Sequence, residues 1–351
     1  MLQIGMIGTG GMANAHAEKF KIFKDVKITA CCDVDPERGR NYSEKWMIPR
    51  VYTDYRELLA KEELDGVAVV TPDIYHAPIS MAAINKGLAV LCEKPMATTL
   101  DEARQMVRLA RRKKVINMVN FSYRHSAAVQ AAAQKVRNGE IGNLCHVEAS
   151  YLQSWIVSRI WGDWRKQRWT IWRMSKANRN LGCLGDIGCH IYDMTAFICG
   201  DFSEIFCRLK NFKKDVPGQK LQGFRLDAND SFASAVAFKS GATGIIHGSR
   251  YAGGYGNTLS IRIFGTKGSL EINLDQSADQ YRLIQGNKAL DTKTWTLVKG
   301  KPTPNNHQRF IRAIKSGRND VSDFVNGLKN QAYLHYSLLS DRLGRSLKIK
   351  F

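Results

Sequence analysis

The sequence lacks any uninterrupted apolar run near the roughly 18 to 20 residues that a membrane-spanning helix needs. Its start, Met1–Gly5, lacks the basic stretch and cleavage site of a signal peptide and enters a buried-strand pattern at once. None of the eight cysteines forms a C-x-x-C pair, which argues against a zinc ribbon or a redox dithiol. We therefore expect a cytoplasmic protein without membrane association, in which most thiols are small buried hydrophobic groups.

Acidic residues are few beside the basic ones, with 32 Asp and Glu against 52 Lys and Arg, a net charge of +20. Such a charge permits binding of nucleic acid or of an acidic substrate without proving either. No RNP, zinc-finger or homeodomain pattern accompanies it, so we expect a solvated basic surface and no nucleic-acid partner. The 351 residues, 44% hydrophobic and 24% charged, are typical of a globular protein with two domains or one large one.

The first 120 residues alternate short apolar runs with amphipathic stretches. Runs such as Gly66–Val70 are apolar throughout, as strands buried on both faces must be. Strand and helix in alternation predict a parallel sheet with helices on both faces. The expected strands are Leu2–Ile7, Lys27–Cys32, Gly66–Thr71, Leu88–Cys92 and Val115–Val119, and the expected helices are Met12–Phe20, Pro36–Trp46, Tyr75–Lys86 and Leu100–Arg112.

The pattern changes after about Ser122. Alternating strands with glycine-rich turns run from Ser203 to about Thr296, which predicts an open, mainly antiparallel sheet with helices on one side. Other expected elements are an extended stretch, Leu144–Trp155, and helices at Ala127–Arg137, from near Gly185, at Asn306–Lys315 and at Val321–Leu343. The predicted class is α/β, with domains at residues 1–121 and 122–351.

The first expected strand ends in the turn Gly8–Ala13, a G-x-G-x-x-A pattern that opens a helix. Gly8 allows the tight turn, Gly10 lets the backbone approach a pyrophosphate, and Ala13 permits close packing of helix and strand. An ordinary glycine turn is the alternative, but its place after an N-terminal strand favours dinucleotide binding. The expected cofactor contacts here are Gly8, Thr9, Gly10, Gly11, Met12 and Ala13.

The second expected strand ends in an acid, Asp33, about 20 residues further on. Its carboxylate can accept hydrogen bonds from both ribose hydroxyls and would repel a 2′-phosphate. This favours NAD over NADP, although Arg38 and Arg40 lie nearby and could soften the preference.

Two later expected strands also end in chemically capable residues, and ligands of open α/β sheets bind beyond such ends. Thr71, Pro72 and His76 follow one strand and are expected to contact the cofactor; a helix-capping role for Asp73 or Thr71 and a surface position for His76 are the alternatives. Glu93 and Lys94 follow the other strand and are expected cofactor contacts as well. The Lys94 ammonium suits a hydrogen bond to a substrate oxygen and would stabilise alkoxide charge that develops there.

A further constellation lies in residues 184–193. If this stretch is helical, Asp186 and His190 share one face at i and i+4, with Asp193 near it. An imidazole beside a carboxylate suits a general base that takes the proton of an alcohol. A metal site using Asp186, Cys189 and His190 is the rival, but no further cluster supplies ligands; a plain surface helix is the other alternative.

Together these segments resemble the Gfo/Idh/MocA oxidoreductase family, which includes glucose–fructose oxidoreductase and inositol dehydrogenases. The combination of a Glu-Lys-Pro turn with a later Asp-x-x-x-His is specific, and the matches extend over most of the chain. The matching segments are Gly8–Ala13, Cys32–Asp35, Thr71–His76, Glu93–Pro95, Asn120–Arg124 and Gly182–Asp193.

The resemblance implies a Rossmann domain followed by an α/β domain with a large open sheet that mediates homodimers or homotetramers. It implies that Lys94 contacts the reacting oxygen and that His190, oriented by Asp186, is the acid/base. Tyr123 and Arg124 match the segment that lines the family's cleft. The implied reaction exchanges hydride between NAD and a hydroxyl-bearing carbon of a sugar, sugar derivative or cyclic polyol, with no metal.

Two points depart from this scheme or add to it. Cys183 and Leu184 stand where relatives often have glycines or small residues, which puts fine positioning in doubt. A cofactor-sensing regulator on the same scaffold is the other class of function, and the net charge would suit it. The presence of Lys94, Asp186 and His190 argues against that rival, because a sensor has no need of them.

The segment Trp155–Arg179 holds five of the seven tryptophans and seven basic residues against one acid. An aromatic face can pack on a pyranose, and an arginine can grip hydroxyls or a carboxylate. We expect Trp172 and Arg173 to contact a glycoside or an acidic sugar. The alternative is a loop that packs on its own domain or at a subunit contact.

Overall fold

The computed structural model describes the backbone of residues 1–351 and every side chain except those of Arg168 and Asn178. The chain divides into two compact units: Met1–Phe121 with Pro304–Gln331, and Ser122–Thr303 with Ala332–Phe351. The sequence-based boundary therefore needs one correction, because Pro304–Gln331, which we had assigned to the second domain, pack with the first. Their contact partners lie about 200 residues away in the sequence, and no local pattern reveals them.

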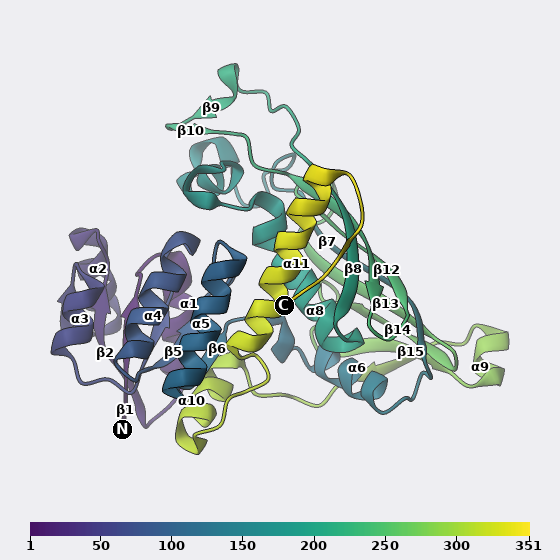
Figure 1. Cartoon of the computed structure of the whole chain (residues 1–351), viewed down its shortest axis with the longest axis horizontal. Helices are drawn as coiled ribbons and strands as arrows, with labels where there is room; N and C mark the ends of the chain where they lie inside the picture. The colour runs from purple at the N-terminus through teal and green to yellow at the C-terminus, as the bar shows by residue number, and fades with distance from the viewer. The chain divides into compact units, whose positions relative to one another are not determined.

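The first unit is built on a six-stranded parallel sheet with the strand order β3-β2-β1-β4-β5-β6 (Figure 1). This order reverses direction between β1 and β4, so a crevice forms beyond the carboxyl ends of those strands. The strands are β1 (Leu2–Ile7), β2 (Val26–Cys32), β3 (Arg50–Tyr52), β4 (Gly66–Val69), β5 (Ala89–Cys92) and β6 (Asn117–Val119).

Helices cover both faces of this sheet and form two hydrophobic cores. Alternate strand residues enter opposite cores: Ile4 and Met6 pack with one set of helices, Val67 and Val69 with the other. The first set comprises α1 (Gly11–Phe20), α2 (Pro36–Trp46) and α10 (Asn306–Ser316), and the second α3 (Tyr55–Lys61), α4 (His76–Asn85) and α5 (Leu100–Lys113). Local signals fix several of these helices: Asp35 caps α2 ahead of Pro36, and Thr99 forms a capping box with Glu102 on α5.

Two elements of the first unit escaped sequence analysis. Strand β3 has only three residues, two of them exposed, and α3 has only two buried side chains. Neither carries the apolar run or stripe from which an element can be read.

The second unit is built on a nine-stranded sheet with the order β16-β15-β14-β13-β7-β12-β11-β8-β17 (Figure 1). Only the β7–β12 pair is parallel among the described pairs, so the sheet is mainly antiparallel, as predicted. The strands are β7 (Leu144–Gln153), β8 (Phe202–Lys210), β11 (Ser231–Phe238), β12 (Thr243–Ser249), β13 (Asn257–Gly265), β14 (Gly268–Asn273), β15 (Gln280–Gln285), β16 (Thr296–Lys299) and β17 (Leu347–Lys348).

Helices α6 (Ala127–Arg137) and α8 (Cys189–Cys199) cover one face of this sheet, together with the second half of α11 (Phe324–Leu343) (Figure 1). The core between them buries Ile191 and Tyr192 of α8 against Phe202 and Phe232 of the strands. This packing fixes which side of α8 faces the sheet and which side bears His190.

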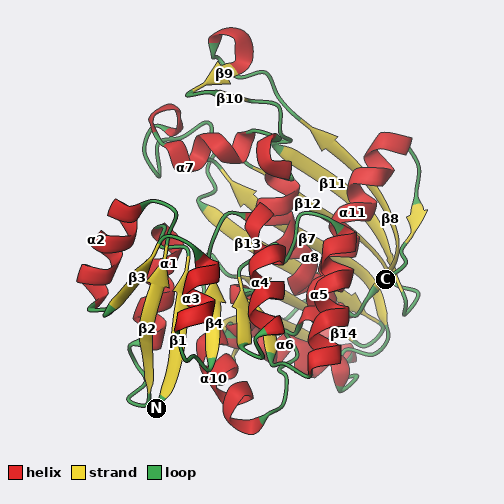
Figure 2. Cartoon of the chain, turned by 60° about the vertical axis from the view of Figure 1, so that its left-hand side comes forward, coloured by secondary structure: helices red, strands yellow, loops and turns green.

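A small lobe extends from one end of the nine-stranded sheet (Figure 2). It combines the Trp-rich segment with the hairpin of β9 (Lys220–Leu221) and β10 (Phe224–Arg225). Short helical turns replace the loop in the Trp-rich segment, namely η3 (Trp164–Lys166), α7 (Arg168–Ile171), η4 (Trp172–Met174) and η5 (Ala177–Arg179). The unit also contains α9 (Asn287–Thr292), η2 (Ser122–His125), η6 (Leu184–Gly188) and η7 (Pro217–Gln219).

No helix within the described part of the chain combines the length and apolar character needed to cross a membrane.

Candidate active site

The turn after β1 has the geometry that a dinucleotide requires. Gly8 has φ +91°, and a Cβ there would lie 2.6 Å from the Val70 carbonyl oxygen, so only glycine fits. A Cβ at Gly10 or Gly11 would meet no described heavy atom within 4 Å. Helix α1 therefore begins beside open space, where its first N–H groups can receive a pyrophosphate. These features fit the NAD expected from the sequence.

Asp33 is held by the same turn. The backbone N–H of Thr9 (2.9 Å) and its hydroxyl (2.8 Å) both donate to Asp33 Oδ2, and the Asp35 N–H donates to Oδ1. Nε of Arg38 lies 3.2 Å from Oδ2. The carboxylate is thus fixed at the end of β2, where a ribose would lie, and Thr9 acts by holding Asp33.

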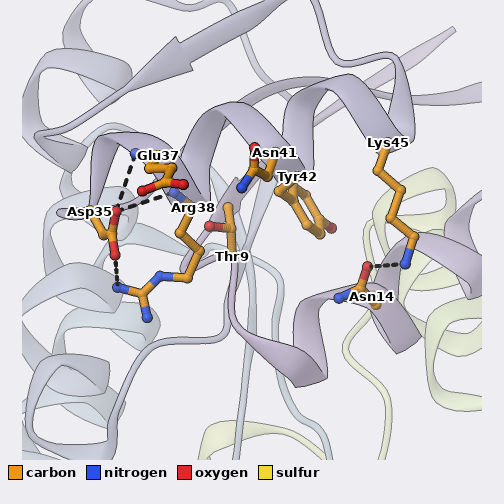
Figure 3. A pocket seen from close by; sticks show the side chains of 8 residues that line it. All are labelled: Thr9, Asn14, Asp35, Glu37, Arg38, Asn41, Tyr42 and Lys45. Atoms are coloured by element: carbon orange, nitrogen blue, oxygen red, sulfur yellow. Dashed lines mark hydrogen bonds and ion pairs between the residues drawn. The ribbon is translucent and has the colours of Figure 1, made fainter.

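A pocket of about 320 Å³ opens beside Thr9, between α1 and α2 (Figure 3). On one side Arg38 pairs with Asp35, and on the other Lys45 donates to Asn14 Oδ1 at 2.9 Å. Its polar walls suit the adenosine end of a dinucleotide. The lining residues are Thr9, Asn14, Asp35, Glu37, Arg38, Asn41, Tyr42 and Lys45.

His76 is buried and ties two turns together. One ring nitrogen lies 2.7 Å from the Pro95 carbonyl oxygen and the other 2.8 Å from that of Thr71. The surface position considered from the sequence is wrong, since His76 is only 1% exposed. Because both nitrogens face backbone oxygens, His76 supports the turn that carries Lys94, whose bond to Pro95 is cis. The hydroxyl of Thr71 makes no capping bond to α4.

Glu93 also anchors the turn that carries Lys94. Its Oε1 lies 2.8 Å from His16 Nε2 and accepts from the Asn120 amide at 2.6 Å, while Oε2 accepts from the Lys94 N–H. Burial alone would raise the pKa of Glu93, but the bond and charge of His16, the charge of Lys94 and the Asn120 bond together hold that pKa far below its usual range. Glu93 is thus an ionised support for Lys94, with both oxygens engaged by protein.

The hydrogen-bond network around Glu93 continues into the late segment Pro304–Gln331, which packs with the first unit. Asn306 donates to the Asn120 side chain at 2.9 Å, and His307 Nε2 lies 3.0 Å from His16 Nδ1. Both residues belong to α10. His16, Asn306 and His307 were not predicted from the sequence, because their partners lie on other elements and no spacing marks them; Asn120 was noted only as part of a matching segment.

The helix that bears Asp186 and His190 starts with a wide turn. The π-helical turn η6 (Leu184–Gly188) runs directly into α8. The helix expected near Gly185 therefore exists, but its first five residues are π-helical. Asn229 anchors its start: the Leu184 N–H donates to Asn229 Oδ1 at 2.9 Å. Gly182, with φ +65°, passes so close to Asn229 that a Cβ would lie 2.8 Å from it.

Asp186 lies between two arginines. Arg250 Nη2 donates to Oδ2 at 2.9 Å, and Arg173 Nε lies 3.6 Å from Oδ1. Two cations beside one carboxylate oppose the binding of a metal ion there.

His190 is 8% exposed and lies among aromatic rings. The ring of Tyr123 meets it edge-on at 4.9 Å between centroids, and that of Tyr151 lies at 6.2 Å. The two tyrosine hydroxyls are 2.8 Å apart, and Tyr151 donates to Asn257 Oδ1 at 2.7 Å. Burial, then the nearby Tyr123 and Asp186, raise the pKa of Tyr151 well above 10, so its hydroxyl keeps its proton.

The hydrogen-bonded chain extends from Asn257 to the small lobe. Gln153 donates its amide to Asn257 Oδ1 at 2.7 Å and accepts from the Trp155 indole at 2.9 Å. The chain thus connects the rings around His190 to the indole that lies over Arg250.

Two protein-family models match this chain. Residues 2–121 match the oxidoreductase family with an NAD-binding Rossmann fold, and residues 129–271 match the GFO/IDH/MocA C-terminal domain, more than half of the chain together. The chain belongs to the Gfo/Idh/MocA oxidoreductase family. The predicted family, fold class, NAD cofactor and oxidoreductase function are confirmed.

Characterised relatives of this Gfo/Idh/MocA protein act on sugars and inositol. Levoglucosan dehydrogenase of Pseudarthrobacter phenanthrenivorans is 27% identical over 301 residues, 78% of this chain and 74% of that protein. Myo-inositol 2-dehydrogenase of Thermotoga maritima is 29% identical over 270 residues, 77% and 74%. A solved levoglucosan dehydrogenase, in complex with NADH and levoglucosan, has TM-score 0.90 at 24% identity over 100% of both chains, which supports the fold.

One expectation for the Gfo/Idh/MocA site needs correction. Arg124 was expected to contact substrate, but it is 3% exposed and forms two 2.7 Å bonds to Asp193. Its guanidinium also stacks on Phe197. Arg124 therefore fastens η2, which carries Tyr123, to α8, and its neighbour Tyr123 is the one that reaches His190. Adjacent positions in a turn face different directions, which the sequence does not show.

Part of the Trp-rich segment packs on its own lobe, one of the two alternatives considered from the sequence, and substrate contact by Trp172 and Arg173 stays a prediction. Trp155 and Trp164 are buried in a core of their own with Ile171 and Met174, so this part packs on its own lobe. Trp172 and Arg173 are partly exposed, and Arg173 stacks on Trp172 while it pairs with Asp186.

The structure assigns the expected catalytic residues to different units. Lys94 belongs to the first unit and Asp186 and His190 to the second. Sequence analysis missed Tyr151 and Gln153 on β7, Asn257 on β13 and Arg250 after β12. Tyr151 and Gln153 occupy inward positions of an alternating strand, Asn257 is exposed and Arg250 follows its strand, and none of these positions carries a local mark of function.

Proposed function

We propose that this protein is an NAD(H)-dependent dehydrogenase or reductase of a hydroxyl-bearing carbon in a neutral sugar, sugar derivative or cyclic polyol. The observation that carries the proposal is the buried His190 between two tyrosine rings, four residues after the arginine-held Asp186 on the continuous helix of η6 and α8. The relatives that act on levoglucosan and myo-inositol support the substrate class.

The proposed roles follow from the chemistry of each side chain. His190 takes the hydroxyl proton during oxidation and returns it during reduction. Lys94, supported by Glu93, stabilises the negative charge that develops on the substrate oxygen. The Gly8–Ala13 turn and Asp33 would hold NAD. When bound, NAD supplies the hydride acceptor.

We propose a neutral substrate because the cations of the second-unit site are already engaged. Arg173 and Arg250 both contact Asp186, and Arg124 is taken up by Asp193. A carboxylate or phosphate on the substrate would have to compete for these arginines. Tyrosine hydroxyls and the Trp172 ring suit the hydroxyls and apolar face of a neutral ring.

We also propose a homodimer or homotetramer formed through the open face of the nine-stranded sheet. Ile245 on that sheet is 50% exposed, and small exposed residues such as Ala233 and Ala235 lie on neighbouring β11. A cytoplasmic location is likewise proposed, and the eight free cysteines support it.

The experiment is a screen of NAD⁺ reduction with neutral sugars, inositols, glycosides and sugar acids, each compared with the His190→Ala variant. We expect turnover of at least one neutral compound and its loss in the variant. Turnover restricted to sugar acids would contradict the neutral class. Absence of turnover with every compound, together with salt-sensitive DNA binding, would favour a cofactor-sensing regulator instead.

A further inference from the structure

Arg250 is the most deeply buried charged group around Asp186 and His190, the proposed acid–base pair. It follows β12 directly, and its side chain is 0% exposed. One end of the guanidinium donates to Asp186 Oδ2 at 2.9 Å and the other to the Arg173 carbonyl at 3.1 Å. Its face lies over the Trp155 indole, with the guanidinium carbon 5.2 Å from the ring centroid. Removing this arginine from water costs free energy, and its bond to the Asp186 carboxylate offsets that cost.

The two arginines on Asp186 are not equivalent. Arg173 has a side chain 24% exposed and comes within 3.6 Å, so water screens its charge. Arg250 is fully enclosed, and its bond is shorter. The enclosed arginine therefore has the greater influence on the orientation of the carboxylate and on its effective charge.

We propose that Arg250 is a positioning residue for the reaction: it acts through Asp186, holding that carboxylate in place and offsetting its charge so that His190 can serve as a base. This inference rests on the proposed function, in which Asp186 and His190 form the acid–base pair. An uncompensated carboxylate one helical turn away would stabilise the imidazolium and weaken the base. With Arg250 in place, the charge of Asp186 is compensated and does not trap the proton on His190.

Other titratable groups around Asp186 complete its surroundings. Tyr151 from β7 and Cys183 from the start of the helix both feel its charge, and both stay protonated because burial raises their pKa values. Asp230 at the start of β11 is neutralised by Lys214 at 2.5 Å. Arg250 is therefore a buried cation with a direct bond to Asp186, whereas the charge of Arg173 is screened by water.

The direct test is an NMR titration of His190 in the holoprotein, with its signal assigned by loss in the His190→Gln variant. We expect Arg250→Gln to raise the pKa of His190 by about one unit, because the Asp186 charge is then less compensated. In an Asp186→Asn background the same substitution should shift the pKa by less than about a third of that amount. Arg262→Gln, which removes an exposed arginine from β13, is the control and should leave His190 unchanged.

A second variant covers the case in which Arg250→Gln fails to fold. Arg250→Lys keeps the charge but cannot make both bonds, so we expect kcat to fall about tenfold with KM nearly constant. A purely structural Arg250 would lower the melting temperature without moving the His190 pKa, and its effect would add to that of Asp186→Asn. An unshifted pKa in Arg250→Gln, or unchanged kcat in Arg250→Lys, overturns the proposal.

Failure of this inference can be told from failure of the proposed function. If His190→Gln retains full turnover, the acid–base assignment is wrong, whatever the titration shows. If His190→Gln is inactive but Arg250→Gln leaves the titration and the acidic limb of kcat/KM unmoved, only the role of Arg250 is wrong.

Discussion

Three buried cations, Arg124, Arg250 and Lys214, each contact a carboxylate at 2.9 Å or less. An unpaired buried charge costs several kcal/mol, so loss of either partner would destabilise the fold. Two of these cations, Arg124 and Arg250, lie around His190 and are already engaged by carboxylates. We therefore expect hydroxyls and rings, such as those of Tyr123 and Tyr151, to recognise the substrate.

At the residue scale, the acid–base assignment gives the sharpest prediction. His190→Ala and Lys94→Ala should each lower kcat by about 10² to 10⁴, the usual contribution of a positioned proton-transfer or charge-stabilising group. Steady-state kinetics gives the loss, and fluorescence titration with NADH should give a Kd close to that of the parent. Turnover within a factor of three of the parent in both variants would contradict the assignment.

Asp33 gives a prediction on the cofactor. Asp33→Ser removes the charge that repels a 2′-phosphate. It also releases Arg38, which contacts the Asp33 carboxylate in the parent protein. We expect the ratio of kcat/KM for NADP⁺ to that for NAD⁺ to rise about 10- to 100-fold, roughly 1.4 to 2.7 kcal/mol. Glu44→Gln, an exposed change on the same helix α2, should leave the ratio constant. A parent enzyme that already prefers NADP⁺ would refute the role given to Asp33.

At the scale of single elements, the turn after β5 depends on partners from α1, from the end of β6 and from α10. His16, Asn120 and Asn306 connect these elements through buried polar contacts beneath Glu93. A half-satisfied buried network is worse than none, so the loss of one member affects the others.

Glu93→Gln should therefore lower the free energy of unfolding at pH 7 by about 3 kcal/mol. The pKa of Glu93 is lowered in the folded state, so its contribution is complete above the ordinary value of 4.5 and is lost as pH falls below it. Denaturation at pH 7 and at pH 4 measures the difference between parent and variant, which should shrink at the lower pH. Glu63→Gln, at an exposed position, is the control; an equal difference at both pH values would exclude the ionised form.

The element scale also shows where sequence reasoning stops. The Gly8–Ala13 turn, Asp33 and the Glu93–Lys94 pair could be predicted because each role depends on a local turn at a strand end. Arg250 and Asn257 could not, since one follows its strand and the other is the exposed first residue of its strand, and their partners lie on other elements. Arg124 was misjudged because one turn, η2, sends neighbouring side chains to different places.

At the scale of the whole molecule, the exposed face of the nine-stranded sheet bears on assembly. We expect Ile245→Glu to shift the protein toward the monomer, because a charge would be buried without a partner in the proposed interface. Size-exclusion chromatography with light scattering measures the change. Ile22→Glu, an exposed isoleucine of the first unit, should not alter the mass; a monomeric parent would dismiss the interface.

The return of Pro304–Gln331 to the first unit has a consequence for biosynthesis. Phe310 and Ile311 complete a core whose other members lie among the first 120 residues. While the chain leaves the ribosome, that core stays open until nearly the whole sequence has been translated. The part of the chain made first is thus among the last to be finished, and a nascent chain halted before residue 304 would present an incomplete nucleotide-binding fold to chaperones.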